Sequence, residues 1–128
     1  MDVVGAIEKR RAYRSLNPVE ISQGPIVSLA KRASLATSCF NNQPWRFIFV
    51  VDPDKLHEIF LALSKNNDWF TNALMAVAIF SKKSFKCVMR DGREYFFFNI
   101  GIALELLILR VTGMSLVART IAGESLLF

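Results

Sequence analysis

The chain has 128 residues, which is enough for one domain with a hydrophobic core and below the usual size of two. Its formal net charge is +5, and its basic side chains gather near the N-terminus and again at residues 82–86. Neither group has the length or the aromatic interleaving of a nucleic-acid-binding surface. One histidine and two scattered cysteines argue against a structural zinc site.

Cys39 and Cys87 could form one disulfide, but no other feature of the chain indicates a secreted protein. The first residues, Met1 to Val4, contain no basic segment followed by a long apolar run, so no signal peptide is predicted. We therefore expect a cytoplasmic protein. The positive charge is interpreted as that of an ordinary basic protein, with an acidic partner as the alternative.

The first part of the chain predicts two helices and a strand. Asp2 can cap a helix over residues 3–11. Ser22 or Gly24-Pro25 is predicted to open a second helix that continues to residue 36, with Pro25 near the first turn, where its missing N–H is harmless. The β-rich run 47–51 follows and is interpreted as a buried strand.

The middle of the chain alternates helix and strand. Asp52-Pro53 begins a helix that continues to residue 63, and His57 on it is interpreted as an exposed surface residue. Residues 69–72 predict one helical turn, and the apolar run 74–80 predicts a second buried strand. The polar and basic segment 81–91 is expected to be a loop or a short helix.

The longest predicted helix covers residues 92–112. Gly113 is expected to end it in the left-handed conformation, and residues 115–118 are expected to form a third short strand. Mixed helices and short strands of this kind predict a single α+β domain over residues 1–128.

Residues 95–109 are the apolar extreme of the chain. The run is shorter than the roughly 20 residues that a membrane span needs, and Asn99 and Glu105 interrupt it. We interpret it as a buried core helix, with a membrane span as the alternative. A helix that is apolar on nearly every face must be covered on nearly every face, which is difficult for so small a domain. A partner subunit is therefore expected.

The arginine-rich segment 10–14 lies at the end of the first predicted helix. Guanidinium groups match phosphate oxygens in a bidentate fork, which makes Arg10, Arg11 and Arg14 candidate phosphate ligands. Cations are also favourable near a helix C-terminus, so solvated charges at the helix end are the alternative interpretation.

The run from Ser38 to Gln43 is the densest group of neutral hydrogen-bonding side chains, and Pro44 and Trp45 follow it. It lies in a loop between a predicted helix and a predicted strand, and such loops often carry binding function. Hydroxyl, thiol and amide groups beside an aromatic ring suit a planar, heteroatom-rich ligand. A well-hydrogen-bonded turn with Trp45 as its core anchor is the alternative.

Three motifs occur in a fixed order along the chain. They are Ile-x-x-Arg-Arg-x-x-Arg from Ile7, Ser-x-x-Asn-x-Gln-Pro-Trp from Ser38, and Asn-x-Gly-x-Ala-x-x-x-Leu-x-Leu from Asn99, with Ile-Ala-Gly ending at Gly123. In this order they resemble the nitroreductase family of FMN-dependent oxidoreductases over nearly the whole chain. Taken alone, the last segment would be interpreted as a simple turn.

The resemblance implies an FMN site. The arginine segment would hold the phosphate and ribityl chain, and the loop would reach the flavin from the neighbouring subunit. Asn67 would lie near the pyrimidine edge of the ring, and the Ile-Ala-Gly backbone near its N5 edge. Two positions differ from the usual family residues, an alanine for a serine and a threonine for a proline. The matching positions are Arg10, Arg11, Ala12, Arg14, Thr37, Ser38, Cys39, Asn41, Asn67, Ala122 and Gly123.

The resemblance also implies a nitroreductase-like fold, with a central, mainly antiparallel sheet flanked by helices and the long central helix at a homodimer interface. Hydride would pass from NAD(P)H through flavin N5 to a nitroaromatic, a quinone or a similar electron-poor acceptor by a ping-pong cycle. No catalytic protein residue and no metal is required, because the flavin carries the redox chemistry.

The family pattern continues past Ile-Ala-Gly with a further helix and strand, whereas this chain ends at Phe128. We therefore expect a C-terminally shortened member with a weaker hold on the phosphate. A catalytically weak or inactive flavin-binding or structural relative is the alternative. A small basic interaction module without a cofactor is a third possibility.

Overall fold

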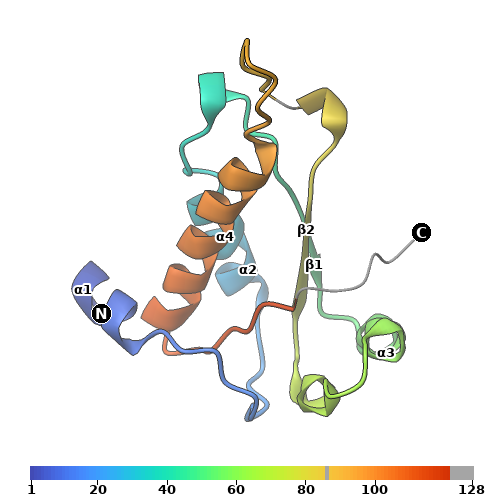
Figure 1. The fold of residues 1–128 in the computed structure, drawn as a ribbon. Coiled ribbons are helices and arrows are strands. Elements are labelled where there is room, and N and C mark those ends of the chain that lie inside the picture. Colours follow the sequence, from blue (N-terminus) through green and yellow to red (C-terminus); the bar gives the residue numbers. More distant parts are fainter. Residues whose placement is uncertain (86, 122–128) are drawn as a thin grey trace.

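The computed structural model describes residues 1–85 and 87–121. Figure 1 shows α2 and α4 on one side of two paired strands, with α3 at the end of the strands away from the loop of residues 38–42. Short 3₁₀ turns cover Cys39–Asn41, Asp68–Asn72 and Lys83–Phe85. The helices and strands are α1 (Val3–Lys9), α2 (Gln23–Ala33), β1 (Arg46–Val50), α3 (Pro53–Ala62), β2 (Ala76–Phe80) and α4 (Phe96–Gly113).

Local side-chain chemistry explains where two helices begin. The Asp2 carboxylate accepts a hydrogen bond from the Gly5 amide at 2.8 Å, and the Asp52 carboxylate accepts one from the Lys55 amide at 3.0 Å. Each bond satisfies one of the free N–H groups at a helix N-terminus. Both starts were predicted from the sequence, and both are confirmed.

The sheet joins the two halves of the chain. β1 and β2 pair antiparallel, with Phe47 opposite Ile79 and Phe49 opposite Val77. Both phenylalanines pack on a cluster centred on the fully buried Leu29 of α2. A polar contact also ties α2 to α4, because Arg110 Nε donates to Ser28 Oγ at 3.2 Å.

The buried residues of α4 lie in both core clusters. Leu107 belongs to the cluster around Leu29, and Ala103 packs with Ala36 and Trp45 in the second cluster. Among the described residues α4 is the one helix long and apolar enough to cross a membrane by length and composition, with a mean hydropathy of 1.7. Its packing in both clusters identifies it as a core helix of this fold.

One face of α4 is left uncovered in a single chain. Phe97 is 72% exposed and Phe98 is 65% exposed. A single chain therefore does not cover this helix on every face, which agrees with the expectation that so small a domain cannot do so alone. The exposed phenylalanines are the apolar surface that a partner was expected to cover.

The end of α4 differs from its prediction. Gly113 is the last helical residue, Met114 is the cap, and Ser115 has a φ of +60°. The turn thus places its left-handed residue two positions later than expected. Residues 115–118 are not a strand, because among the described residues only β1 and β2 form a sheet. The helix also begins at Phe96, four residues later than predicted.

Candidate functional site

The loop after α2, residues 37–43, has an unusual backbone. Phe40, Asn41 and Gln43 have φ values of +49°, +55° and +45°, in the left-handed region that non-glycine residues seldom adopt. The Ser38 hydroxyl holds the loop closed by accepting the Gln43 amide at 3.0 Å. Such conformations persist where the surroundings enforce them, and they cluster at ligand sites. Trp45, 5% exposed, supplies the anchor.

A disulfide fixes this loop to a distant segment. Cys39 is bonded to Cys87, 48 residues later, so the pairing that the sequence left open is present in the structure. The Tyr95 amide donates to the Cys87 carbonyl at 3.3 Å, which joins the same segment to the start of α4. A disulfide between two loops cannot be inferred from two isolated cysteines, since nothing local brings them together.

The segment around Cys87 contains a small charged hairpin. Arg93 Nε donates to Asp91 Oδ2 at 2.6 Å, and the Arg93 amide donates to Asp91 Oδ1 at 3.1 Å. The hydrogen bond from the Arg93 side chain lowers the pKa of Asp91 below its usual value. This carboxylate is therefore ionised near neutral pH and holds the turn, which is fully exposed to solvent.

A pocket of about 370 Å³ opens between the loop and the first turns of α4. Its size lies within the range of small-molecule sites, roughly 300–1,000 Å³. Among residues 1–85 and 87–121, the side chains that line it carry hydroxyl, amide, sulfur and aromatic groups and no charge. The lining residues are Thr37, Ser38, Cys39, Met89, Tyr95, Phe98, Asn99 and Ile102.

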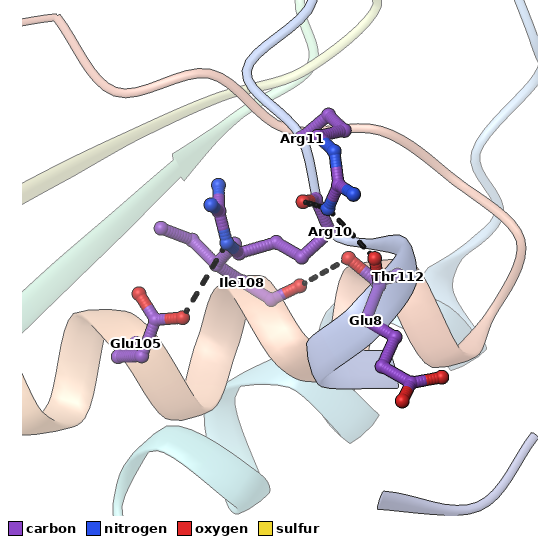
Figure 2. A network of polar contacts seen from close by, with 6 residues as sticks. All are labelled: Glu8, Arg10, Arg11, Glu105, Ile108 and Thr112. Carbon is purple, nitrogen blue, oxygen red and sulfur yellow. Dashed lines mark hydrogen bonds and ion pairs between the residues drawn. The ribbon is translucent and has the colours of Figure 1, made fainter. Parts of the chain in front are cut away.

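The arginine segment lies on the other side of the domain, where α1 meets α4 (Figure 2). Arg10 Nε lies 3.8 Å from Glu105 Oε1 of α4. Arg11 Nη1 donates to the carbonyl of Glu8 at 2.7 Å and so caps the end of α1. Arg11 thus takes the helix-end role that was the alternative interpretation. Arg14 is exposed.

Arg119 connects the arginine segment to the middle of the chain, and the sequence analysis did not assign it a role. Its Nη1 donates to the Ala12 carbonyl at 3.2 Å, across 107 residues. Its guanidinium carbon lies 5.5 Å from the centre of the Trp69 ring, a distance at which a cation is attracted to an aromatic face. Neither contact has a local signal in the sequence.

Asn67 directly precedes the turn that contains Trp69, the aromatic residue that Arg119 contacts. Its side-chain amide donates to the Ser64 carbonyl at 2.9 Å, so the amide is already used within the turn. Ala122 and Gly123 were also predicted to contact a ligand, and both lie outside the described residues.

Two buried donors have no hydrogen-bond partner within residues 1–85 and 87–121. They are Trp69 Nε1, beside Arg119, and Nδ2 of Asn99, a residue that lines the pocket. A buried donor without an acceptor costs about 1–3 kcal/mol. Neither residue was predicted as a site residue: Trp69 lies beside Arg119, and Asn99 shares the pocket lining with Thr37, Ser38 and Cys39.

The two groups do not meet in one chain. Figure 1 shows the arginine segment, in dark blue, toward the C-terminal end of α4, and the loop of residues 37–43, in teal, toward its N-terminal end. Any ligand that contacts both groups must therefore bridge two copies or lie along the helix.

Residues 7–68 match the family model described as "Nitroreductase family". This segment contains the arginines, the loop and Asn67. Over these residues the chain is similar to the nitroreductase family. A curated relative, "Putative NAD(P)H nitroreductase YdgI" of Bacillus subtilis (strain 168), is 28% identical over 81 residues, which are 62% of this chain and 39% of the relative.

Solved structures of nitroreductases share the fold. The FMN-dependent nitroreductase of Clostridium difficile R20291 is 26% identical with a TM-score of 0.72, over 87% of this chain and 61% of that chain. A nitroreductase family protein of Clostridium novyi NT is 20% identical with a TM-score of 0.75, over 89% and 65%. The chain thus spans less than two thirds of the length of each of these relatives.

Proposed function

We propose that this protein is an FMN-dependent oxidoreductase that works as a homodimer, with one flavin at each of two equivalent sites between the subunits. The observation that carries the proposal is the separation of the two groups of site residues. The arginine segment and the amide-rich loop lie toward different ends of α4, so a second copy is the simplest way to bring them to one ligand.

The residues present fit the parts of FMN. Arg10, Arg11 and Arg14 would hold the phosphate, because guanidinium groups bind phosphate oxygens strongly. The pocket beside the loop, whose described lining residues carry no charge, suits the ring. The remaining proposed contacts are made by Ala12, Thr37, Ser38, Cys39, Asn41, Asn67, Ala122 and Gly123.

The ion pair between Arg10 and Glu105 does not oppose phosphate binding. Both side chains are partly exposed, at 38% and 55%, and their atoms lie 3.8 Å apart. A pair of this kind contributes about 0–1 kcal/mol. A charge-assisted hydrogen bond to phosphate contributes about 1.5–3 kcal/mol, so the phosphate would displace the carboxylate.

When bound, FMN supplies the transfer of hydride from NAD(P)H to a nitroaromatic, quinone or similar electron-poor acceptor by a ping-pong cycle. The protein's own part is to bind and orient. The loop amides and hydroxyls would place fixed dipoles at the edge of the ring, where charge accumulates on reduction. The exposed Phe97 and Phe98 of α4 would be covered by the partner subunit.

The first experiment is an absorbance scan of the purified protein before and after FMN is added. A yellow protein, or a colourless one that retains added FMN, supports the proposal, and failure to take up FMN contradicts it. Stopped-flow mixing of the FMN-loaded protein with NADH, and then with NADPH, separates an enzyme from an inactive flavin-binding relative. Bleaching of the flavin absorbance identifies the enzyme.

Replacing Arg10 by alanine is expected to weaken FMN binding by about ten- to a hundredfold, since one charge-assisted hydrogen bond is lost. Fluorescence titration of FMN measures the dissociation constant. Arg32→Ala is the matched control, because it removes an equal charge from the exposed end of α2. Equal affinities for both variants would show that Arg10 does not bind the phosphate.

Subunit mixing tests the shared site. Asn41→Gly removes the loop amide and keeps a residue that tolerates the φ of +55°. If the arginines and the loop act from different subunits, exchanging Arg10→Ala protein with Asn41→Gly protein restores one native site in each mixed dimer. Recovery of high-affinity FMN binding in up to half of the mixed-dimer sites is the expected result. No recovery after demonstrated exchange would place both groups in one subunit.

A further inference from the structure

The disulfide between Cys39 and Cys87 joins two connecting segments of the chain. Cys39 begins the 3₁₀ turn after α2, and Cys87 lies between the 3₁₀ turn of Lys83–Phe85 and the start of α4. In the described part of the chain, neither cysteine belongs to the two clusters in which α2, α4 and the sheet pack. The helices and the sheet therefore pack on one another without the bond, and the bond acts directly on the loop of residues 37–43.

The Cys87 side of the bond is also held by other contacts. Val88 pairs with Glu94 in an antiparallel bridge, which closes a hairpin directly after the cysteine. Before the cysteine, the centre of the Phe85 ring lies 4.3 Å from the guanidinium carbon of Arg46 at the start of β1, a distance at which the two groups attract each other. These contacts do not involve the sulfur atom, so this segment keeps its place when the bond is broken.

The Cys39 side is held differently. The Gln43 amide donates to the Ser38 hydroxyl at 3.0 Å, and the Asn41 amide donates to the Ser38 carbonyl at 3.0 Å. Both hydrogen bonds lie within the loop, so neither fixes it to the rest of the domain. Phe40 at its centre is 85% exposed and adds little packing. The left-handed residues of this loop need surroundings that enforce their conformation, and the disulfide supplies such a restraint.

A reductant reaches one of the two sulfur atoms more easily than the other. Cys39 is half-buried and lines the pocket of about 370 Å³, whereas Cys87 is 5% exposed. Exchange between a thiol and a disulfide requires access to the sulfur that is attacked. Attack is therefore expected at Cys39, with Cys87 as the leaving group.

We infer that this disulfide is a reversible redox switch, reduced by a dithiol, that controls the conformation of the loop of residues 37–43. A thiolate of the dithiol attacks Cys39 Sγ, the bond between the two cysteines breaks, and Cys87 leaves as a thiolate that takes up a proton. The second thiol of the dithiol then attacks the mixed disulfide, which releases Cys39 as a thiol and the reductant as a cyclic disulfide. Two electrons and two protons thus pass to the protein. The part of the inference that concerns flavin affinity rests on the proposed function.

Hydrogen exchange measured by mass spectrometry tests the switch without any ligand. After treatment with dithiothreitol, the amides of residues 37–43 are expected to exchange about tenfold faster, because the loop opens locally. The amides of α4 should stay protected over the same minutes, and the far-UV circular dichroism of the helices should be retained. Thiol labelling checks that both cysteines are reduced, and removal of the reductant with reoxidation should restore slow exchange.

Flavin affinity provides the second measurement. The reduced protein, freed of dithiothreitol, is expected to bind FMN about tenfold more weakly than the oxidised protein, since binding must then order the loop. Quenching of flavin fluorescence on titration gives both dissociation constants. Cys87→Ser is the matched control, because it keeps Cys39 and cannot form the bond. This variant should have the weaker affinity and the faster loop exchange both with and without reductant.

The outcomes are distinct. Faster loop exchange and weaker FMN binding that both reverse on reoxidation support the inference. Unfolding of the helices on reduction would overturn it, because the disulfide would then be required for the fold. Equal loop exchange in the two states would overturn it as well. Faster exchange with unchanged FMN affinity would overturn control of the flavin site and leave the proposed function intact. If neither state binds FMN, the proposed function fails, and loop exchange alone decides whether the disulfide is a switch.

Discussion

Replacing Cys39 and Cys87 together by serine is expected to lower the free energy of unfolding by about 4 kcal/mol, because the disulfide closes a loop of 48 residues in the unfolded chain. Without the disulfide, the loop of residues 37–43 beside the pocket is no longer bonded to the segment before α4. Urea unfolding of the variant and of the unaltered protein, followed by circular dichroism, measures the difference.

Dithiothreitol provides the control for this prediction. The reductant should destabilise the unaltered protein by a similar amount and should leave the serine variant unaffected. A thiol reagent should titrate two thiols only after reduction. Two thiols that react in the native, unreduced protein would contradict the presence of the disulfide.

Replacing Leu29 by alanine is expected to lower the free energy of unfolding by about 3–4 kcal/mol. Leu29 is fully buried between α2, α4 and the sheet, and a leucine-to-alanine change at such a site loses transfer free energy and leaves a cavity. Urea unfolding at a fixed protein concentration gives the value, which keeps any contribution from subunit association constant.

Leu61→Ala is the matched control, because it makes the same chemical change on α3 at a side chain that is 69% exposed. It should change stability by less than about 0.5 kcal/mol. Similar losses for the two variants would show that Leu29 does not lie in the core. The difference between them also tests the packing that holds α4 in place.

The sequence indicated the features that depend on contacts between residues close together in the chain. Asp2 and Asp52 mark helix starts because each carboxylate bonds an amide three residues away. The exposed position of His57 on α3 also followed from the local pattern and is confirmed. The arginine segment and the amide-rich loop were recognised as candidate groups because their residues are consecutive.

The residue that takes the left-handed conformation after α4 was predicted wrongly from the local sequence. A glycine near the end of a helix commonly takes the left-handed conformation, yet here Ser115 takes it. The Leu116 amide donates to the Val111 carbonyl, and Leu116 packs on the cluster around Leu29. Tertiary packing of the residue after the turn thus decides where the turn lies.

The residue pattern alone indicated a resemblance to the nitroreductase family, the two paired strands, most of the helices and two candidate groups of ligand-binding residues. Three features became visible only in the folded chain: Cys39 pairs with Cys87, Arg119 reaches Ala12, and Asn99 Nδ2 is buried without an acceptor among residues 1–85 and 87–121. The physical reason is the distance in the chain over which each contact acts. Caps and turns depend on residues a few positions apart, whereas these three features depend on segments that only the packed core brings together.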